Sequence, residues 1–374
     1  MPDSNGAIEQ QPGGAERLRE VRYECSRQFV PILEHLGATL LVSTYQAGKL
    51  VALSPREHKL ALSFVNFDRP MGVAARQDGI AVACRDHLWY LRNAPDIAPR
   101  IPAQPSFDAC FLARQAMVTG EIQAHEMAFV GPELWVVNTL FSCLATVHSD
   151  FSFVPRWRPP FVTALAAEDR CHLNGLAVVD GQARYATAMA QTDVAGGWRS
   201  DKVHTGCVID VAADRVIAGG FAMPHSPRWY QGQLWVLDSG RGRLITVDPA
   251  GGAVQTVAEM PGYTRGLALH GQFAFVGLSK IRETSTFGGV PIAQRMDELK
   301  CGVGVFDLQS RQVVATFQFI AGVDEIFDVT LLPAVRNPTF RGPHTLQDGE
   351  STVWIVPDGD PTSTPSPSRF LFVC

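Results

Sequence analysis

One pattern of alternating apolar residues recurs along the chain, and it constrains the fold more than any other feature. Residues 234–248 have the pattern of a strand, a polar turn and a second strand, with apolar residues at every other position. The pattern recurs without a gap at residues 134–148 and 40–54, and more loosely at 79–91, 185–211 and 273–308. Self-similarity of this kind predicts a repeat fold.

Each hairpin is associated with two more strands. A short apolar strand precedes it, and another strand follows it, as at residues 254–259 and 313–319. The preceding strands begin at six residues, which we call the opening residues: Met71, His125, Asn174, His225, Arg265 and Glu325. A four-stranded unit that repeats six times predicts an all-β fold, a six-bladed β-propeller.

The two ends of the repeat region complete each other. Residues 39–67 provide the last three strands of a blade without a first strand, and residues 325–332 provide a first strand. Pairing of these N-terminal strands with the C-terminal strand would close the ring and leave no open edge. The apolar run at 353–356 is a competing candidate for a strand of this blade.

Composition and charge indicate how the chain is divided into segments and which classes of partner are unfavourable. The 374 residues are expected to form a flexible lead-in over 1–35, the propeller over 36–357 and a flexible tail rich in Pro, Ser and Thr over 358–374. A formal net charge of −5 without a basic face argues against nucleic acid and membrane partners. The sequence has neither a spanning apolar run nor a secretory signal pattern, which predicts a cytoplasmic protein. Eight scattered cysteines are then expected to be reduced.

The repeat predicts where a site would lie. In a propeller, the first strand of each blade lines the central channel, and the turn between the second and third strands lies on the face where the first strand begins. Two of these turns carry long insertions, a first insertion at residues 190–204 and a second insertion at residues 279–300. We therefore expect a pocket at the opening residues, beneath two insertions that lie near each other.

Five of the six opening residues are polar or ionisable, which core packing does not require. Imidazoles and a carboxylate that converge on one axis can hold one divalent metal ion. The candidate ligands are His125, His225, Glu325, His172 and Asn174. A polar ligand pocket without a metal is an alternative, and so is a purely structural network of hydrogen bonds to water and backbone.

Four charged residues near the same face are candidates for catalysis: Glu126, Arg265, Lys280 and Arg282. The three cationic residues among them together could bind a carboxylate or a phosphate. The sequence has no nucleophile-elbow, Walker or Rossmann motif in a suitable context, so no nucleotide cofactor is expected.

The repeat segments also resemble those of a bacterial family of conserved hypothetical proteins, some of which are fused to, or encoded near, tetratricopeptide-repeat proteins. The segments that carry the resemblance include FDRPMGVA, AHEMAFVGPELWVVNTLFSCLATV, CHLNGLA, MPHSPR, GQLWVLDSGRGRL and AFVGLSKIRE, within residues 35–340. It implies a six-bladed propeller similar to the NHL and gluconolactonase-like superfamily. The gluconolactonase-like relatives hold a divalent cation with Glu, Asn and Asp. Asn174 and Glu325 match two such positions, whereas His125 and His225 depart from them.

Two classes of function remain open. The first is an enzyme, a metal-dependent hydrolase, lyase or oxidoreductase that acts on a small polar ligand at the channel mouth. The second is a non-catalytic propeller that binds a protein or peptide partner. The polar opening residues favour the enzyme. The lack of a recognised catalytic set and the association with repeat proteins favour the binding module.

Overall fold

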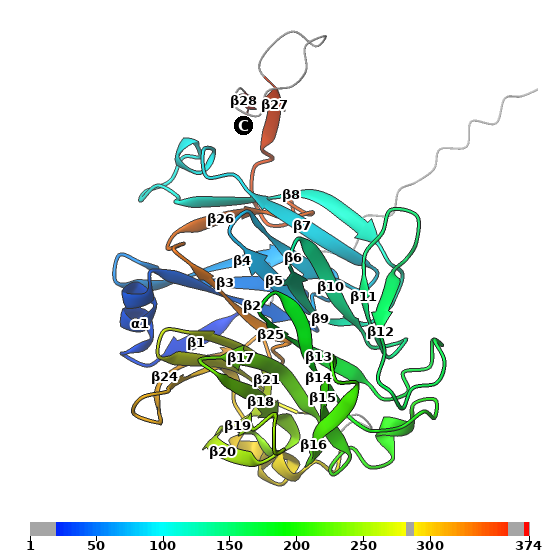
Figure 1. Ribbon diagram of the computed structural model, residues 1–374. Coiled ribbons are helices and arrows are strands. Elements are labelled where there is room, and N and C mark those ends of the chain that lie inside the picture. The colour runs from blue at the N-terminus through cyan, green and yellow to red at the C-terminus, as the bar shows by residue number, and fades with distance from the viewer. Residues whose placement is uncertain (1–19, 282–287, 358–369, 374) are drawn as a thin grey trace, which may run out of the picture.

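The computed structural model describes residues 20–281, 288–357 and 370–373 of the chain. Six sheets surround a central channel, and in each sheet the strands follow one another from the channel outward (Figure 1). Each innermost strand contacts the innermost strand of the next blade, so that the ring is complete. These strands are β25 (Asp328–Pro333), β5 (Val73–Arg76), β9 (Ala124–Val130), β13 (Leu173–Val179), β17 (Pro224–Tyr230) and β21 (Tyr263–His270). The predicted six-bladed propeller is confirmed.

Three further strands extend each blade outward. They are β2 (Ala38–Thr44), β3 (Lys49–Arg56) and β4 (Lys59–Asn66) after β25; β6 (Gly79–Ala83), β7 (His87–Asn93) and β8 (Ala109–Val118) after β5; β10 (Glu133–Asn138), β11 (Cys143–Thr146) and β12 (Val154–Trp157) after β9; β14 (Gln182–Ala188), β15 (Gly206–Asp210) and β16 (Arg215–Phe221) after β13; β18 (Gln233–Asp238), β19 (Arg243–Val247) and β20 (Val254–Glu259) after β17; and β22 (Phe273–Ser279), β23 (Cys301–Asp307) and β24 (Gln312–Ala321) after β21.

The alternating pattern of the sequence reflects burial on both faces of a blade. In β10, Leu134 and Val136 pack in the apolar cluster shared with the preceding blade. Val137 packs in the cluster shared with the following blade. Because successive side chains of a strand point to opposite faces, one short apolar strand contributes to two interfaces between blades.

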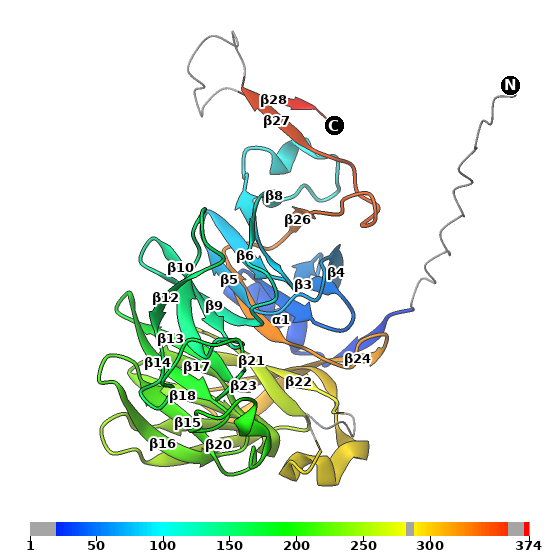
Figure 2. The same ribbon diagram turned by 90° about the vertical axis from the view of Figure 1, so that its right-hand side faces the viewer.

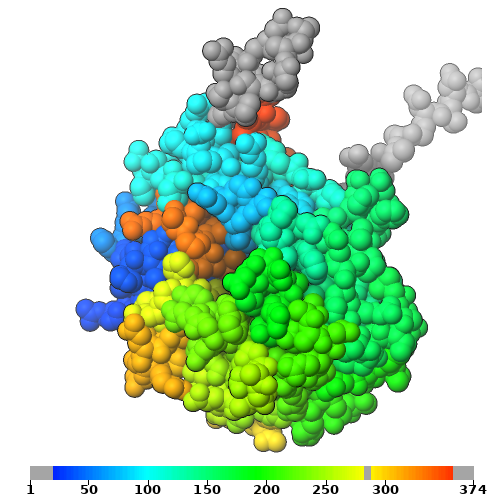
Figure 3. Space-filling view, in the orientation of Figure 1, coloured from blue at the N-terminus to red at the C-terminus, as the bar shows by residue number. Residues whose placement is uncertain are grey.

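The ring closes as the sequence predicts. Strand β25 pairs antiparallel with β2, from Ser43 opposite Asp328 to Ala38 opposite Pro333. The Ser43 hydroxyl donates to the Met71 carbonyl at 2.6 Å, which ties the closing blade to the next blade. In the space-filling view, C-terminal residues coloured orange lie among the blue and light blue residues of the N-terminal part (Figure 3).

Additional elements extend the propeller beyond the predicted unit. Strand β1 (Arg22–Cys25) adds to the outer edge of β24, and β26 (Pro338–Arg341) adds in parallel to β8. Helix α1 (Phe29–Leu36) buries Phe29 and Leu33 completely. The range 1–35 that we expected to be a lead-in therefore contains β1 and most of α1, whereas residues 1–19 lie outside the described residues.

The apolar run at 353–356 does not join the closing blade. Strand β27 (Trp354–Pro357) pairs instead with β28 (Phe370–Val373). This hairpin stands away from the ring, beyond the blade that contains β8 (Figures 1 and 2). The range expected to be a flexible tail thus contains one strand, and its residues 358–369 and 374 lie outside the described residues. None of the helices in the described part of the chain could cross a membrane, given their length and hydropathy.

The two insertions lie together at one end of the channel, as predicted. The described parts of these insertions carry η2 (Gly197–Arg199) and η4 (Pro291–Glu298). Of the two other short helices, η1 (Ala98–Arg100) lies elsewhere, whereas η3 (Ser239–Arg241) contacts η4. One buried apolar cluster contains Ala190 and Trp198 of the first insertion together with Ile281, Val290, Ile292 and Leu299 of the second. The same cluster includes Met223 and Tyr263, which flank the innermost strands β17 and β21. The insertions therefore cover the end of the channel at which the innermost strands begin.

Candidate functional site

Two cavities lie along the axis of the channel, one toward each end. We call the cavity at the insertion end the upper pocket and the cavity at the other end the lower funnel. The upper pocket has a volume of about 10 Å³, which is room for about one water molecule. The lower funnel has a volume of about 360 Å³. The upper pocket is lined by His125, Glu126, Asn174, His225, Ser226, Arg265, Phe327 and Asp328.

Arg265 of β21 is the central group of the upper pocket. Its Nη2 lies 2.6 Å from Nε2 of His125, and its Nη1 lies 3.4 Å from Oε1 of Glu325. The guanidinium also stacks on Phe327, with Cζ 3.3 Å from the ring centroid. Because a guanidinium donates and cannot accept, Nε2 of His125 must be the acceptor, and a neutral His125 then carries its proton on Nδ1.

Two imidazoles, those of His125 and His225, line the upper pocket with this guanidinium, and a third, that of His172, lies beside His125 outside the lining. The ring of His125 lies 5.6 Å from that of His225 and 5.0 Å from that of His172, between centroids. Burial, and then the charge of Arg265, hold the pKa of His125 and of His225 well below the ordinary histidine value. Nδ1 of His225 donates to the Met223 carbonyl at 2.9 Å, so the lone pair of this neutral ring is on Nε2.

His172 has the orientation that acid–base catalysis requires. Its Nδ1 lies 2.9 Å from Oδ1 and 3.1 Å from Oδ2 of Asp169. The same carboxylate accepts from Nε1 of Trp198 at 2.8 Å and lies 3.3 Å from Nη2 of Arg199. With Nδ1 donating to Asp169, Nε2 of His172 keeps a lone pair that can take up a proton.

The backbone around these side chains adopts a conformation that residues with a Cβ rarely adopt. The φ angles are 46° at Asp169, 50° at His172, 54° at Met223 and 50° at Ser226. Such positive φ angles in residues other than glycine are uncommon and concentrate at functional sites. The local strain therefore coincides with the residues that position the imidazoles.

Two hydrogen-bond donors of the upper pocket have no partner among the described residues. They are Nε of Arg265 and Nδ2 of Asn174, and both are buried. The side-chain oxygen of Asn174 is occupied, because it accepts from the Thr187 hydroxyl at 2.7 Å. A buried donor without an acceptor is costly, so this pocket favours a group that brings acceptor oxygens.

Of the residues predicted as metal ligands, His125, His225 and Asn174 line the upper pocket, and Glu325 and His172 lie next to it. Nε2 of His125 is engaged by Arg265, and Glu325 pairs with the same guanidinium. Among the residues that the structure describes, no three or more His, Cys, Asp or Glu side chains form a group that could hold a metal ion. A buried positive charge at the centre also opposes a second cation. The divalent metal stays a prediction.

The predicted catalytic candidates separate into different places. Arg265 is central to the upper pocket, and Glu126 borders both cavities. Lys280 lies apart from the lining of the upper pocket, and its Nζ is 3.6 Å from Oδ1 of Asp324. Arg282 lies outside the described residues. The predicted grouping of three cationic residues is therefore reduced to Arg265 in the described structure.

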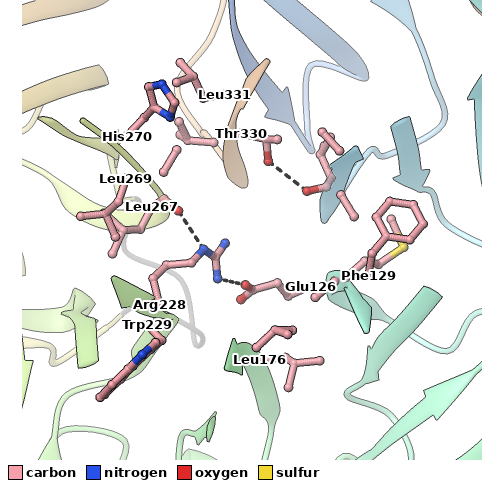
Figure 4. Close-up of a pocket in the computed structure, with 18 of the residues that line it drawn as sticks. Glu126, Phe129, Leu176, Arg228, Trp229, Leu267, Leu269, His270, Thr330 and Leu331 are labelled. Atoms are coloured by element: carbon pink, nitrogen blue, oxygen red, sulfur yellow. Dashed lines mark hydrogen bonds and ion pairs between the residues drawn. The ribbon is translucent and has the colours of Figure 1, made fainter. Parts of the chain in front are cut away.

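A buried charge cluster separates the upper pocket from the lower funnel. The guanidinium of Arg228 in β17 donates to the Glu126 carboxylate and, through Nε, to the Leu267 carbonyl at 2.9 Å (Figure 4). Its Nη2 lies 3.9 Å from Oδ1 of Asp328. Burial raises the pKa of Glu126 to about 7, although the charge of Arg228 acts in the opposite direction. Two carboxylates thus face one guanidinium.

Sequence analysis did not identify Asp169, Arg228 and Asp328 as site residues. Strict alternation from His225 would direct Pro227 to the channel, but the register of β17 shifts between His225 and Arg228. This bulge brings Arg228 to the channel. An arginine within an innermost strand was the available signal for Arg228, and the spacing of three residues from Asp169 to His172 was a weaker one.

Comparisons with known proteins support the fold and define the family. No curated protein sequence matches the chain. Among solved structures, a chain of the "Crystal structure of Nidogen/Laminin Complex" is similar, with a TM-score of 0.50 and 11% identity over 80% of this chain and 99% of that chain. At this identity the similarity shows the fold alone. The resemblance to NHL and gluconolactonase-like propellers and the association with tetratricopeptide repeats stay predictions. Residues 27–340 match the domain of unknown function DUF4915, and the chain therefore belongs to that family.

Proposed function

We propose that the upper pocket binds a small ligand through a carboxylate or phosphate group and acts on it by acid–base catalysis. The observation that carries this proposal is the buried guanidinium of Arg265, whose Nε has no partner among the described residues. Arginine is well suited to oxyanions because its planar donors match the geometry of two acceptor oxygens. The Nδ2 of Asn174 supplies a second donor in the same pocket.

The neutral imidazoles beside Arg265 support an anion as the ligand, while the carboxylates of Glu126 and Asp328, which also line the upper pocket, oppose one. The neutral imidazoles of His125 and His225 do not repel an anion, and the lowered pKa values keep them neutral near pH 7. Glu325 is the carboxylate that pairs with Arg265, at 3.4 Å from Nη1. An oxyanion ligand would compete with this pairing or add to it at Nε, and it would stabilise a guanidinium that burial otherwise disfavours.

The insertions support a pocket that excludes water once the ligand is inside. With a volume of about 10 Å³, the upper pocket accepts a ligand only when the covering side chains move. Trp198 of the first insertion lies against His172, with ring centroids 4.4 Å apart. Closure of apolar side chains over a charged site strengthens each electrostatic interaction within it.

His172 is the acid–base residue of this proposal. Asp169 fixes its Nδ1, so Nε2 is the atom that takes a proton from the ligand or from a water molecule and returns it later. The reaction class is then a proton-transfer-dependent hydrolysis, elimination or isomerisation. A non-catalytic module that binds a protein partner would not require an oriented histidine beside a buried arginine.

Binding is tested by thermal unfolding and calorimetry with acetate, malonate and inorganic phosphate. We expect at least one of these anions to raise Tm and to bind, and we expect Arg265→Gln to abolish both effects. The matched control is Arg243→Gln, because Arg243 is an exposed arginine whose Nε pairs with Glu259 at 3.0 Å outside the channel. Equal effects of the two substitutions, or no binding of any of these anions, would contradict the proposal. Preference between acetate and phosphate identifies the ligand group.

The catalytic part and the metal alternative need separate measurements. In an NMR screen of carboxylate- and phosphate-bearing compounds, His172→Gln should abolish any turnover while the binding of the probe anion persists. Elemental analysis of the purified protein tests the metal prediction. A stoichiometric divalent metal that is lost on His125→Ala would replace the anion as the ligand of this pocket.

A further inference from the structure

The lower funnel is a second cavity that the proposed function does not use. Its volume of about 360 Å³ is in the range of small-molecule sites, and all six innermost strands contribute to its lining. Most of the lining residues are apolar, and among them Phe129, Leu269 and Leu331 have partly exposed side chains. Arg228 and Glu126 reach toward each other in its interior, so one end of the cavity is charged (Figure 4).

The buried charges between the lower funnel, which Glu126 and Arg228 line, and the upper pocket, which Glu126 and Asp328 line, do not balance. Glu126 and Asp328 are both buried, with exposed fractions of 4% and 3%, and Arg228 is the guanidinium that faces both of them. Asp328 is further held by the backbone N–H groups of Val73 and Val329, each at 2.8 Å. The other buried guanidinium of the channel, Arg265, pairs with Glu325. Among the described residues that pair across the channel, the three carboxylates of Glu126, Asp328 and Glu325 therefore outnumber the two guanidinium groups of Arg228 and Arg265 by one.

An uncompensated carboxylate in a low-dielectric cavity attracts a cation, because a second positive charge restores neutrality there. The walls of the lower funnel further restrict the kind of cation that fits. A metal ion or an inorganic cation would leave the partly exposed apolar side chains of Phe129, Leu269 and Leu331 uncovered, whereas an organic body would cover them.

We propose that the lower funnel binds an organic cation, a protonated amine on a compact apolar body. The ammonium group would donate to the carboxylate of Glu126, and the apolar body would lie against Phe129 and Leu269. This site is distinct from the upper pocket in both its lining and the charge of its ligand, and it does not depend on the proposed function.

The test compares three probes of the same shape by isothermal titration calorimetry at pH 8: benzylamine, benzyl alcohol and benzoate. Benzylamine should bind at least about tenfold more tightly than benzyl alcohol, because only the ammonium group neutralises the excess carboxylate. Benzoate should not compete with benzylamine. Equal affinities of benzylamine and benzyl alcohol, or displacement of benzylamine by benzoate, would overturn the proposal.

Three substitutions locate the binding. Glu126→Gln should weaken benzylamine at least about tenfold and leave benzyl alcohol unchanged, because it removes the charge and keeps the shape. Leu269→Trp, which fills part of the funnel, should abolish binding of both compounds. The matched control is Glu133→Gln, an exposed carboxylate of β10 that pairs with Arg156 away from the channel. Benzylamine binding that survives Leu269→Trp would place it elsewhere and overturn the proposal.

Two outcomes keep this inference separate from the proposed function. Arg265→Gln should abolish binding of the probe anions and leave benzylamine binding intact. If Glu126→Gln fails to fold, Leu269→Trp together with the three-probe comparison still decides the question. Loss of benzylamine binding in Arg265→Gln protein that remains folded would show that the amine depends on the upper pocket, and the proposal of a separate site would fail.

Discussion

The two ends of the channel are built from the same six strands, yet they differ in charge and in access. At the upper end, Arg265 pairs with Glu325 and shares the pocket with two imidazoles beneath two insertions. At the lower end, Arg228 faces Glu126 and Asp328, and the walls of the funnel are mostly apolar. We therefore propose an anion as the ligand of the upper end and a cation with an apolar body as the ligand of the lower end.

The difference follows from the direction of the innermost strands. All six strands begin at the insertion end, so the first residues of each strand share one environment and the last residues share the other. In β9, His125 and Glu126 come first, and Met127 and Phe129 follow. An innermost strand can therefore place polar side chains toward one end of the channel and apolar side chains toward the other, as β9 does.

The largest expected effect comes from the lower end. Arg228→Met should lower the free energy of unfolding by about 3–5 kcal/mol, because it leaves two buried carboxylates without their counter-charge. Arg265→Met should cost less, about 1–3 kcal/mol, since its partner Glu325 keeps a side-chain exposure of 14% and can be hydrated. Urea unfolding of both variants measures this order directly.

A second substitution shows whether the stability lost in Arg228→Met comes from charge or from packing. Glu126→Gln added to Arg228→Met should recover part of the lost stability, because a neutral amide needs no counter-charge. If the double variant is as unstable as Arg228→Met alone, the loss comes from packing. If Arg265→Met lowers the free energy of unfolding more than Arg228→Met does, the buried charge at the upper end contributes more to stability than the one at the lower end. The expected order would then be reversed.

An intermediate effect is expected from the cover of the upper pocket. Ile292→Ala should cost about 2 kcal/mol, the lower part of the range for a buried isoleucine, because a surface insertion can collapse around the lost side chain. Hydrogen exchange should become faster in residues 190–204, which share the cluster with Ile292, and stay unchanged in β5 and β9 at the funnel. Uniform acceleration across all blades would contradict a local cover.

Titration of His225 and titration of Glu126 should change the free energy of unfolding with pH in opposite directions. The pKa of His225 is lowered in the folded state, so the unfolded chain binds the extra proton and stability falls as pH drops below about 6.5. The pKa of Glu126 is raised from 4.5 to about 7, so the folded state binds the extra proton, and stability falls as pH rises through that window.

Two variants isolate these slopes by urea unfolding at pH 5, 6 and 7. Relative to the unsubstituted protein, His225→Asn should become more stable as pH falls from 6.5 to 5, and Glu126→Gln should become more stable as pH rises from 5 to 7. Each slope should reach about 1.4 kcal/mol per pH unit at most. Parallel pH profiles for both variants would contradict the assignment of these protons.

The fold could be predicted from the sequence because each blade repeats a local pattern, and the closing blade could be predicted because residues 39–67 lack a first strand. The gathering of His125, His172 and His225 followed from the same repeat. The proposed preference for an anion could not be predicted, because it depends on Arg265 reaching His125 across the channel at 2.6 Å, over 140 positions of sequence. The role of Arg228 depends on a bulge that alternation does not reveal.

The smallest effect tests whether charge at the rim of the upper pocket matters. Sequence analysis grouped Lys280 with Arg265 as cationic residues for one anion, but the Lys280 side chain is 37% exposed and its Nζ lies 3.6 Å from Asp324. A partly exposed pair of this kind contributes little, since water and salt screen it. Lys280→Gln should therefore change stability by less than about 0.5 kcal/mol and the affinity for acetate or phosphate by less than about twofold at physiological salt. If Lys280→Gln weakens anion binding as much as Arg265→Gln does, the anion binds at the rim and not at the buried guanidinium. The contrast between a closed upper end and an open lower end would then no longer hold.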